Sequence, residues 1–178
     1  MKMKKYSTLA LASIFALASC SEKKDASTTT KTKANSALIA LILQEKPTKP
    51  ADIADLRKAA KPGDQVTFSG DILGSENVFM EGRAVMILGD PKKITACNQN
   101  PDENCETPWD ACCDDPEVKM ASILTVQAVD DEGKPLKEGF KGLGGMKELS
   151  SLIVTGEVAK GSTDSNMQVN ATGIFVKK

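Results

Sequence analysis

Four of the five cysteines of this 178-residue chain lie together in the stretch CNQNPDENCETPWDACC. They are Cys97, Cys105, Cys112 and Cys113, with the spacing C-x7-C-x6-C-C, and the only tryptophan, Trp109, lies among them. Thiolates bind soft metal ions, pair as disulfides or act as nucleophiles. The spacing and the compartment together decide which chemistry to expect.

The fifth cysteine, Cys20, follows a lysine-rich start and an apolar run at residues 9–18. That run is about half the ~20 residues that a membrane-spanning helix needs, so residues 1–19 are predicted to be a signal peptide. The sequence Leu17-Ala18-Ser19-Cys20 resembles the bacterial lipobox. The resemblance implies cleavage before Cys20 and lipid attachment to its thiol, which would anchor the protein firmly to a membrane.

This resemblance makes the cell envelope the expected location. Ser21 follows Cys20 where inner-membrane lipoproteins often carry aspartate, which favours the outer membrane. Thiols exported beyond the inner membrane are usually oxidised, and an even number of cysteines in one loop then favours disulfides.

The spacing of the four loop cysteines also favours disulfides over a metal. Four-cysteine zinc sites usually contain C-x2-C pairs, which this loop lacks, and adjacent cysteines are awkward ligands for one ion. A Cys112–Cys113 bond would close a strained ring. We therefore predict two disulfides, either Cys97–Cys112 with Cys105–Cys113 or Cys97–Cys113 with Cys105–Cys112. Metal thiolates and reactive thiols are the alternatives.

Trp109 and the acidic residues near it are the other candidates in this loop. We expect the indole to pack over the disulfides; the alternative is an exposed platform that binds a sugar or peptide together with Asp110, Asp114 and Asp115. Acidic groups also bind Ca²⁺, but the D-x-D-x-D-G pattern is absent. We predict no metal and no cofactor, and keep zinc or calcium handling as the alternative function.

A second resemblance involves the end of the same loop. The string C-x-T-P-W-D-x-C-C resembles a loop of uncharacterised small exported proteins of bacteria, and it is formed here by Cys105, Thr107, Pro108, Trp109, Asp110, Cys112 and Cys113. The resemblance implies family membership and carries no activity with it.

The composition excludes several kinds of catalysis. The chain contains no histidine, which excludes Ser–His and Cys–His catalysis, histidine-ligated metals and imidazole pH switches. No P-loop or nucleophile-elbow pattern occurs in a suitable context. We therefore expect a protein that is not an enzyme.

The elements that must position the cysteine loop are mainly strands. Alternating or compact apolar patterns predict five strands, at residues 65–73, 83–90, 121–130, 152–158 and 167–176. Five strands with a short helical element between the third and fourth resemble an OB-fold. We predict a mainly β protein, a small five-stranded OB-fold-like barrel with a preceding helix and a cysteine-rich loop insertion; a six-stranded sandwich is the alternative.

The chain divides into four predicted segments. They are a signal peptide (1–19), a flexible tether (20–36), a helical segment (37–61) and the barrel (62–178) with its loop at 97–117. The barrel segment carries 11 basic and 19 acidic residues, a net charge of −8. An acidic barrel is a poor match for single-stranded nucleic acid, so we expect a membrane contact through Cys20 and a protein, peptide or glycan partner.

Overall fold

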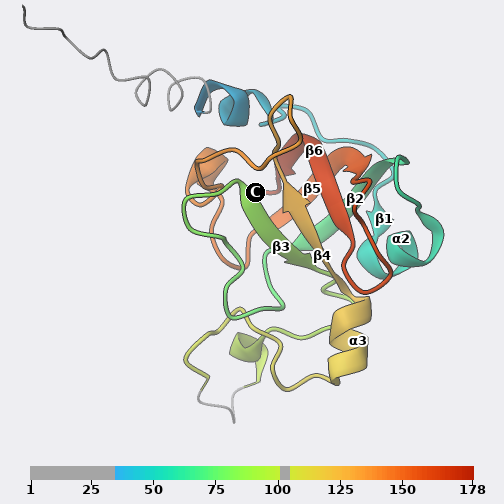
Figure 1. The fold of residues 1–178 in the computed structure, drawn as a ribbon. Coiled ribbons are helices and arrows are strands. Elements are labelled where there is room, and N and C mark those ends of the chain that lie inside the picture. The colour runs from blue at the N-terminus through green and yellow to red at the C-terminus, as the bar shows by residue number, and fades with distance from the viewer. Residues whose placement is uncertain (1–34, 101–104) are drawn as a thin grey trace, which may run out of the picture.

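The computed structural model describes residues 35–100 and 105–178 (Figure 1). The predicted signal peptide, Cys20 and almost all of the tether lie outside the described residues. None of the described helices is long and apolar enough to cross a membrane.

The core of the fold is a closed barrel of five strands (Figure 1). The strands are β2 (Gln65–Asp71), β3 (Val85–Gly89), β4 (Ile123–Gln127), β5 (Ser151–Val158) and β6 (Gln168–Val176). They are hydrogen-bonded in the order β2-β3-β4-β6-β5, and β5 pairs with β2 to close the barrel. Only the β4–β6 pair is parallel among these strands. The predicted OB-fold-like barrel is confirmed.

The strands β2, β3 and β4 bury alternate side chains, whereas β5 buries Leu152, Ile153 and Val154 in succession. Phe68 on β2, Met86 and Leu88 on β3, and Val126 on β4 are fully buried in one hydrophobic core. The short helical element between the third and fourth barrel strands is the 3₁₀ helix η2 (Leu143–Gly145). Burial of these apolar faces holds the barrel closed and leaves the connecting loops outside it.

The predicted helical segment 37–61 contains two short helices with irregular chain between them. Residues 35–40 are helical, and α2 (Ile53–Ala59) follows a two-residue strand, β1 (Ala51–Asp52), that pairs in parallel with β2. The strand β1 was not predicted. A two-residue strand has no periodicity of its own, so only its pairing with β2 reveals it.

Gly70 lies in β2 close to both α2 and β3. A Cβ atom at this position would lie 2.5 Å from the Cδ1 atom of Ile53 and 3.0 Å from the Gly89 carbonyl oxygen. Only glycine therefore allows α2 and β3 to approach β2 this closely.

Candidate metal centre

The cysteine loop connects β3 to β4 and projects from one end of the barrel (Figure 1). It contains the 3₁₀ helix η1 (Cys97–Gln99) and the helix α3 (Pro116–Ala121). The Cys97 N–H donates to the Asp110 carbonyl at 2.7 Å, and the Asn98 N–H donates to the Pro108 carbonyl at 2.9 Å. These bonds bring the two halves of the loop side by side.

The loop also has a small apolar core of its own. Ile94, Ala96 and Ala111 are buried together with Leu73, which follows β2. The Thr95 N–H donates to the Asp114 carboxylate at 2.6 Å, which further ties the beginning of the loop to its end. Packing and hydrogen bonds thus fix the backbone on which the cysteines are mounted.

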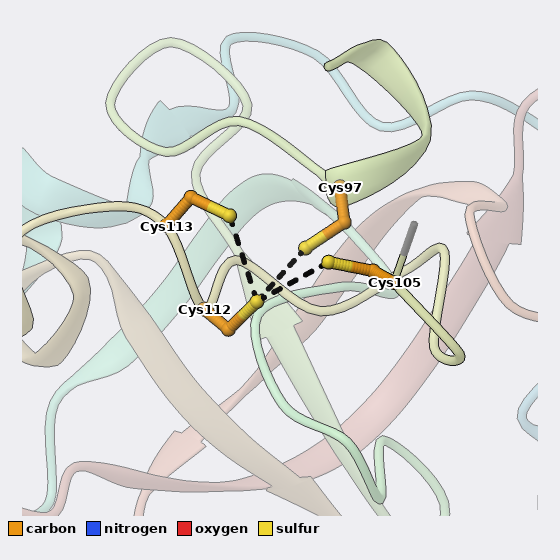
Figure 2. Close-up of side chains that lie close together, drawn as sticks. All are labelled: Cys97, Cys105, Cys112 and Cys113. Atoms are coloured by element: carbon orange, nitrogen blue, oxygen red, sulfur yellow. Dashed lines mark hydrogen bonds between the residues drawn. The ribbon is translucent and has the colours of Figure 1, made fainter. Parts of the chain in front are cut away.

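The four cysteine sulfurs converge on one point (Figure 2). The Cys112 Sγ lies 3.3 Å from that of Cys97, 3.5 Å from that of Cys105 and 3.6 Å from that of Cys113. All four sulfurs lie within 4.8 Å of one another. Cys97 is buried, Cys105 is half-buried, and Cys112 and Cys113 are exposed, so the cluster is open to solvent on one side.

These separations do not correspond to the predicted disulfides. A disulfide bond is about 2.05 Å long, and the three distances around Cys112 are all more than 1 Å longer than that. The disulfide prediction is therefore not shown by the structure and stays a prediction.

We expected adjacent cysteines to be awkward ligands for one ion, but the structure brings the sulfurs of both Cys112 and Cys113 into the cluster. The Asp114 N–H donates to the Ala111 carbonyl at 3.3 Å, which closes a turn with Cys112 and Cys113 at its two corners. Both side chains of this turn point toward the cluster (Figure 2). The turn therefore directs two cysteines at one point, as a C-x2-C pair does in zinc sites.

The cluster has the dimensions of a site for a single tetrahedral ion. Zinc–sulfur bonds of about 2.3 Å place tetrahedral sulfurs about 3.8 Å apart, so an ion would push these sulfurs outward by only a few tenths of an ångström. Four thiolates favour soft ions, zinc above all.

Hydrogen bonding shifts the pKa values of Cys112 and Cys105 in opposite directions. Hydrogen bonds to Cys97, Cys105 and Cys113 lower the pKa of the Cys112 thiol, because they stabilise its thiolate. Hydrogen bonds to Cys97 and Cys112 raise the pKa of the Cys105 thiol to about 12. The Cys112 thiol is therefore a stronger acid than the Cys105 thiol.

Trp109 lies beside the cysteines and packs against the barrel. Its indole Nε1–H donates to the Glu76 carbonyl at 2.9 Å, and its side chain, half-buried, contacts the main hydrophobic core. We expected the indole to cover disulfides; it instead joins the loop to the barrel. One face of it borders a hollow of about 490 Å³, whose wall also includes Phe79 and Met80.

The three acidic residues that we considered as binding groups accept hydrogen bonds within the chain. Asp110 is buried and pairs with Lys119 at 2.7 Å. Asp114 accepts from the Thr95 N–H, and Asp115 accepts from two N–H groups at the start of α3. Across residues 35–100 and 105–178, the cysteines are the one group of three or more metal-ligating side chains that converges. The calcium alternative thus finds no carboxylate cluster in these residues.

Sequence reasoning missed Lys119 and the Glu76 carbonyl as parts of this region. No pattern in the sequence joins Lys119 to Asp110, and none marks a backbone carbonyl as a hydrogen-bond acceptor. Comparison of the chain with protein families, with curated proteins and with solved structures found no match. Fold and site thus define a small closed β-barrel with a four-cysteine cluster.

Proposed function

We propose that this chain is a lipid-anchored envelope protein that binds one zinc ion through Cys97, Cys105, Cys112 and Cys113. The observation that carries the proposal is the convergence of four sulfurs within 4.8 Å of one another. Four thiolates can complete a tetrahedral shell without water, as in sites where zinc holds a loop in place. The metal would therefore stabilise the loop and would not catalyse a reaction.

Two structural features support zinc over the disulfides that we first predicted. Cys112 is the common neighbour of three other sulfurs, an arrangement that suits one central ion better than two separate bonds. The turn at residues 111–114 directs two adjacent cysteines at the same point, and the two disulfide pairings would separate these cysteines into different bonds.

Zinc binding is tested on the full chain, purified both with and without reductant. Elemental analysis should find one zinc per chain, and cobalt substitution should give the visible absorption of a tetrahedral thiolate site. Cys97→Ser should remove most of the metal, whereas Cys20→Ser changes the one cysteine outside the loop and should retain it. Loop cysteines that resist alkylation until reductant is added, in protein without metal, would instead establish the two disulfides.

The membrane anchor is a separate part of the proposal. It is supported by the lipobox-like Leu17-Ala18-Ser19-Cys20, which lies outside the described residues. The described N-terminal end, residues 35–40, lies at the end of the barrel opposite the cysteine loop (Figure 1). An anchor on that side would direct the metal centre away from the membrane. Cys20→Ala should release the protein from the membrane fraction; retention there would contradict the anchor.

A second candidate function is the binding of a peptide or glycan in the hollow beside Trp109. The observation that favours it is the half-buried indole at the edge of a space of about 490 Å³. Aromatic side chains provide large, rigid contact surfaces for such partners. A change in Trp109 fluorescence on titration with short oligosaccharides or peptides would support this function, since the chain contains no other tryptophan.

A further inference from the structure

We propose that the four-cysteine centre is a redox switch, in which a peroxide converts the zinc thiolates into two disulfides and releases the ion. The inference rests on the proposed zinc site and adds its regulation. The same four cysteines would then have two states. In one state they bind the metal that the structure suggests, and in the other they form the disulfides that the sequence predicts.

The exposure of the cluster allows a small oxidant to reach it. Cys112 and Cys113 are exposed, whereas Cys97 is buried behind them. Attack therefore begins at the turn, and Cys112 is the favoured target because three sulfurs surround it at 3.3 to 3.6 Å. Whichever neighbour reacts next is already close to the oxidised sulfur.

The distances also select a pairing. Cys97 is nearest to Cys112, at 3.3 Å between sulfurs, and a bond between these two leaves Cys105 and Cys113 as the second pair. Those two sulfurs also lie within 4.8 Å of each other. The competing Cys112–Cys113 bond would close a strained ring between adjacent residues.

The chemistry balances with hydrogen peroxide as the oxidant. The Cys112 thiolate gives an electron pair to one peroxide oxygen, which forms a sulfenic acid and releases hydroxide. The Cys97 thiolate then attacks the sulfenic sulfur, forms the S–S bond and expels a second hydroxide. A second peroxide repeats these steps at Cys105 and Cys113. In total, two peroxides and four protons become four waters, four thiolates become two disulfides, and the zinc dication leaves.

The loop keeps its frame when the sulfurs change partners. Trp109 is held to Glu76 and Gly74, Cys97 to Asp110 through its backbone, and Asp110 to Lys119 by an ion pair. None of these contacts involves a sulfur atom. Oxidation therefore alters the centre without unfolding the barrel, so reduction in the presence of zinc can restore it.

The test uses the zinc-loaded full chain carrying Cys20→Ser, which removes the fifth thiol. Hydrogen peroxide should release all bound zinc, measured with a zinc-sensitive dye, as four thiols disappear. Peptide mapping should then find Cys97–Cys112 and Cys105–Cys113, and reductant with zinc should restore the starting state. Cys113→Ser provides the second variant: the Cys97–Cys112 bond should still form in it.

The outcomes separate this inference from the proposed function. A chain that never binds zinc would contradict both the proposed zinc site and the redox switch. The chain could also bind zinc and keep it under peroxide, while a free thiol in the same solution is oxidised. That result would contradict the switch and leave the proposed zinc site standing. Zinc release with sulfinic acids, with bonds between chains or with a Cys112–Cys113 bond also overturns the switch.

Discussion

The indole N–H of Trp109 donates a 2.9 Å hydrogen bond to the backbone carbonyl of Glu76, in the loop that connects β2 to β3. The Trp109 carbonyl in turn accepts from the Gly74 N–H, also at 2.9 Å. One residue of the cysteine loop is thus bonded to the barrel through both its side chain and its backbone. The segment that carries Cys112 and Cys113 begins three residues later, so the barrel fixes its position.

Changing Trp109 to Phe should weaken this attachment while keeping an aromatic ring in place. We expect the free energy of unfolding to fall by about 1 kcal/mol, because one hydrogen bond is lost and the Glu76 carbonyl can turn to water. Urea denaturation followed by far-UV circular dichroism measures the loss. An unchanged midpoint would show that the indole N–H contributes nothing to the attachment.

The ion pair between Asp110 and Lys119 should contribute more to the free energy of unfolding than the exposed ion pairs do. Lys119→Met leaves the mostly buried Asp110 carboxylate without its cation, and we expect a loss of about 2 kcal/mol in the free energy of unfolding. The matched control is Lys134→Met, which breaks the pair with Glu132 on the surface and should cost less than about 0.5 kcal/mol. Equal losses in the two variants, measured by thermal unfolding, would contradict this ranking.

The barrel could be predicted because its strands carry their own pattern. Alternating or compact apolar patterns predicted strands at the positions of β2 to β6. The spatial order of the strands, with β4 next to β6, comes from the structure.

The cysteine centre could be predicted in composition and not in geometry. The sequence identifies four cysteines, but the turn that directs Cys112 and Cys113 to one point depends on a backbone bond between Ala111 and Asp114. The attachment of Trp109 depends on a carbonyl 33 residues away. Backbone contacts of this kind leave no signature in residue types, so the prediction from the sequence depended on cysteine spacing and on the expected oxidising compartment, and both favoured disulfides.

Barrel closure is tested at Gly70. Gly70→Ala places a methyl group against the Ile53 side chain and the Gly89 carbonyl, and should cost about 2 kcal/mol of stability through overpacking. The control, Gly161→Ala, adds a methyl group where no atom lies within 4 Å and should change the stability by less than about 0.5 kcal/mol. Urea denaturation compares them, and a neutral Gly70→Ala would show that α2 can move away.

The ion pair between Glu148 and Lys141 should make stability depend on pH. The Lys141 ammonium lowers the pKa of the Glu148 carboxyl from its ordinary 4.5, so the unfolded chain binds this proton more readily than the folded one. The pair therefore stabilises the fold above the unfolded pKa, and its contribution is lost as the pH falls through the folded pKa.

Glu148→Gln should accordingly lower the melting temperature at about pH 7 and have little effect at about pH 3. The exposed Glu45→Gln is the control, and we expect the same melting temperature as the parent at each pH. A Glu148→Gln variant that is destabilised equally at both pH values would show a packing effect in place of an ionic one.

Zinc binding itself should depend steeply on pH if thiolates are the ligands. Protons on the cysteines compete with the ion, and the pKa of the Cys105 thiol, raised to about 12, keeps that proton in place until zinc displaces it. The apparent affinity should therefore rise with pH, by more than tenfold per unit between about pH 6 and about pH 8, because more than one proton is released. Competition with a chelator of known affinity measures the slope. Carboxylates have already lost their protons in this range, so a nearly flat profile would assign the ion to the acidic residues and refute the thiolate centre.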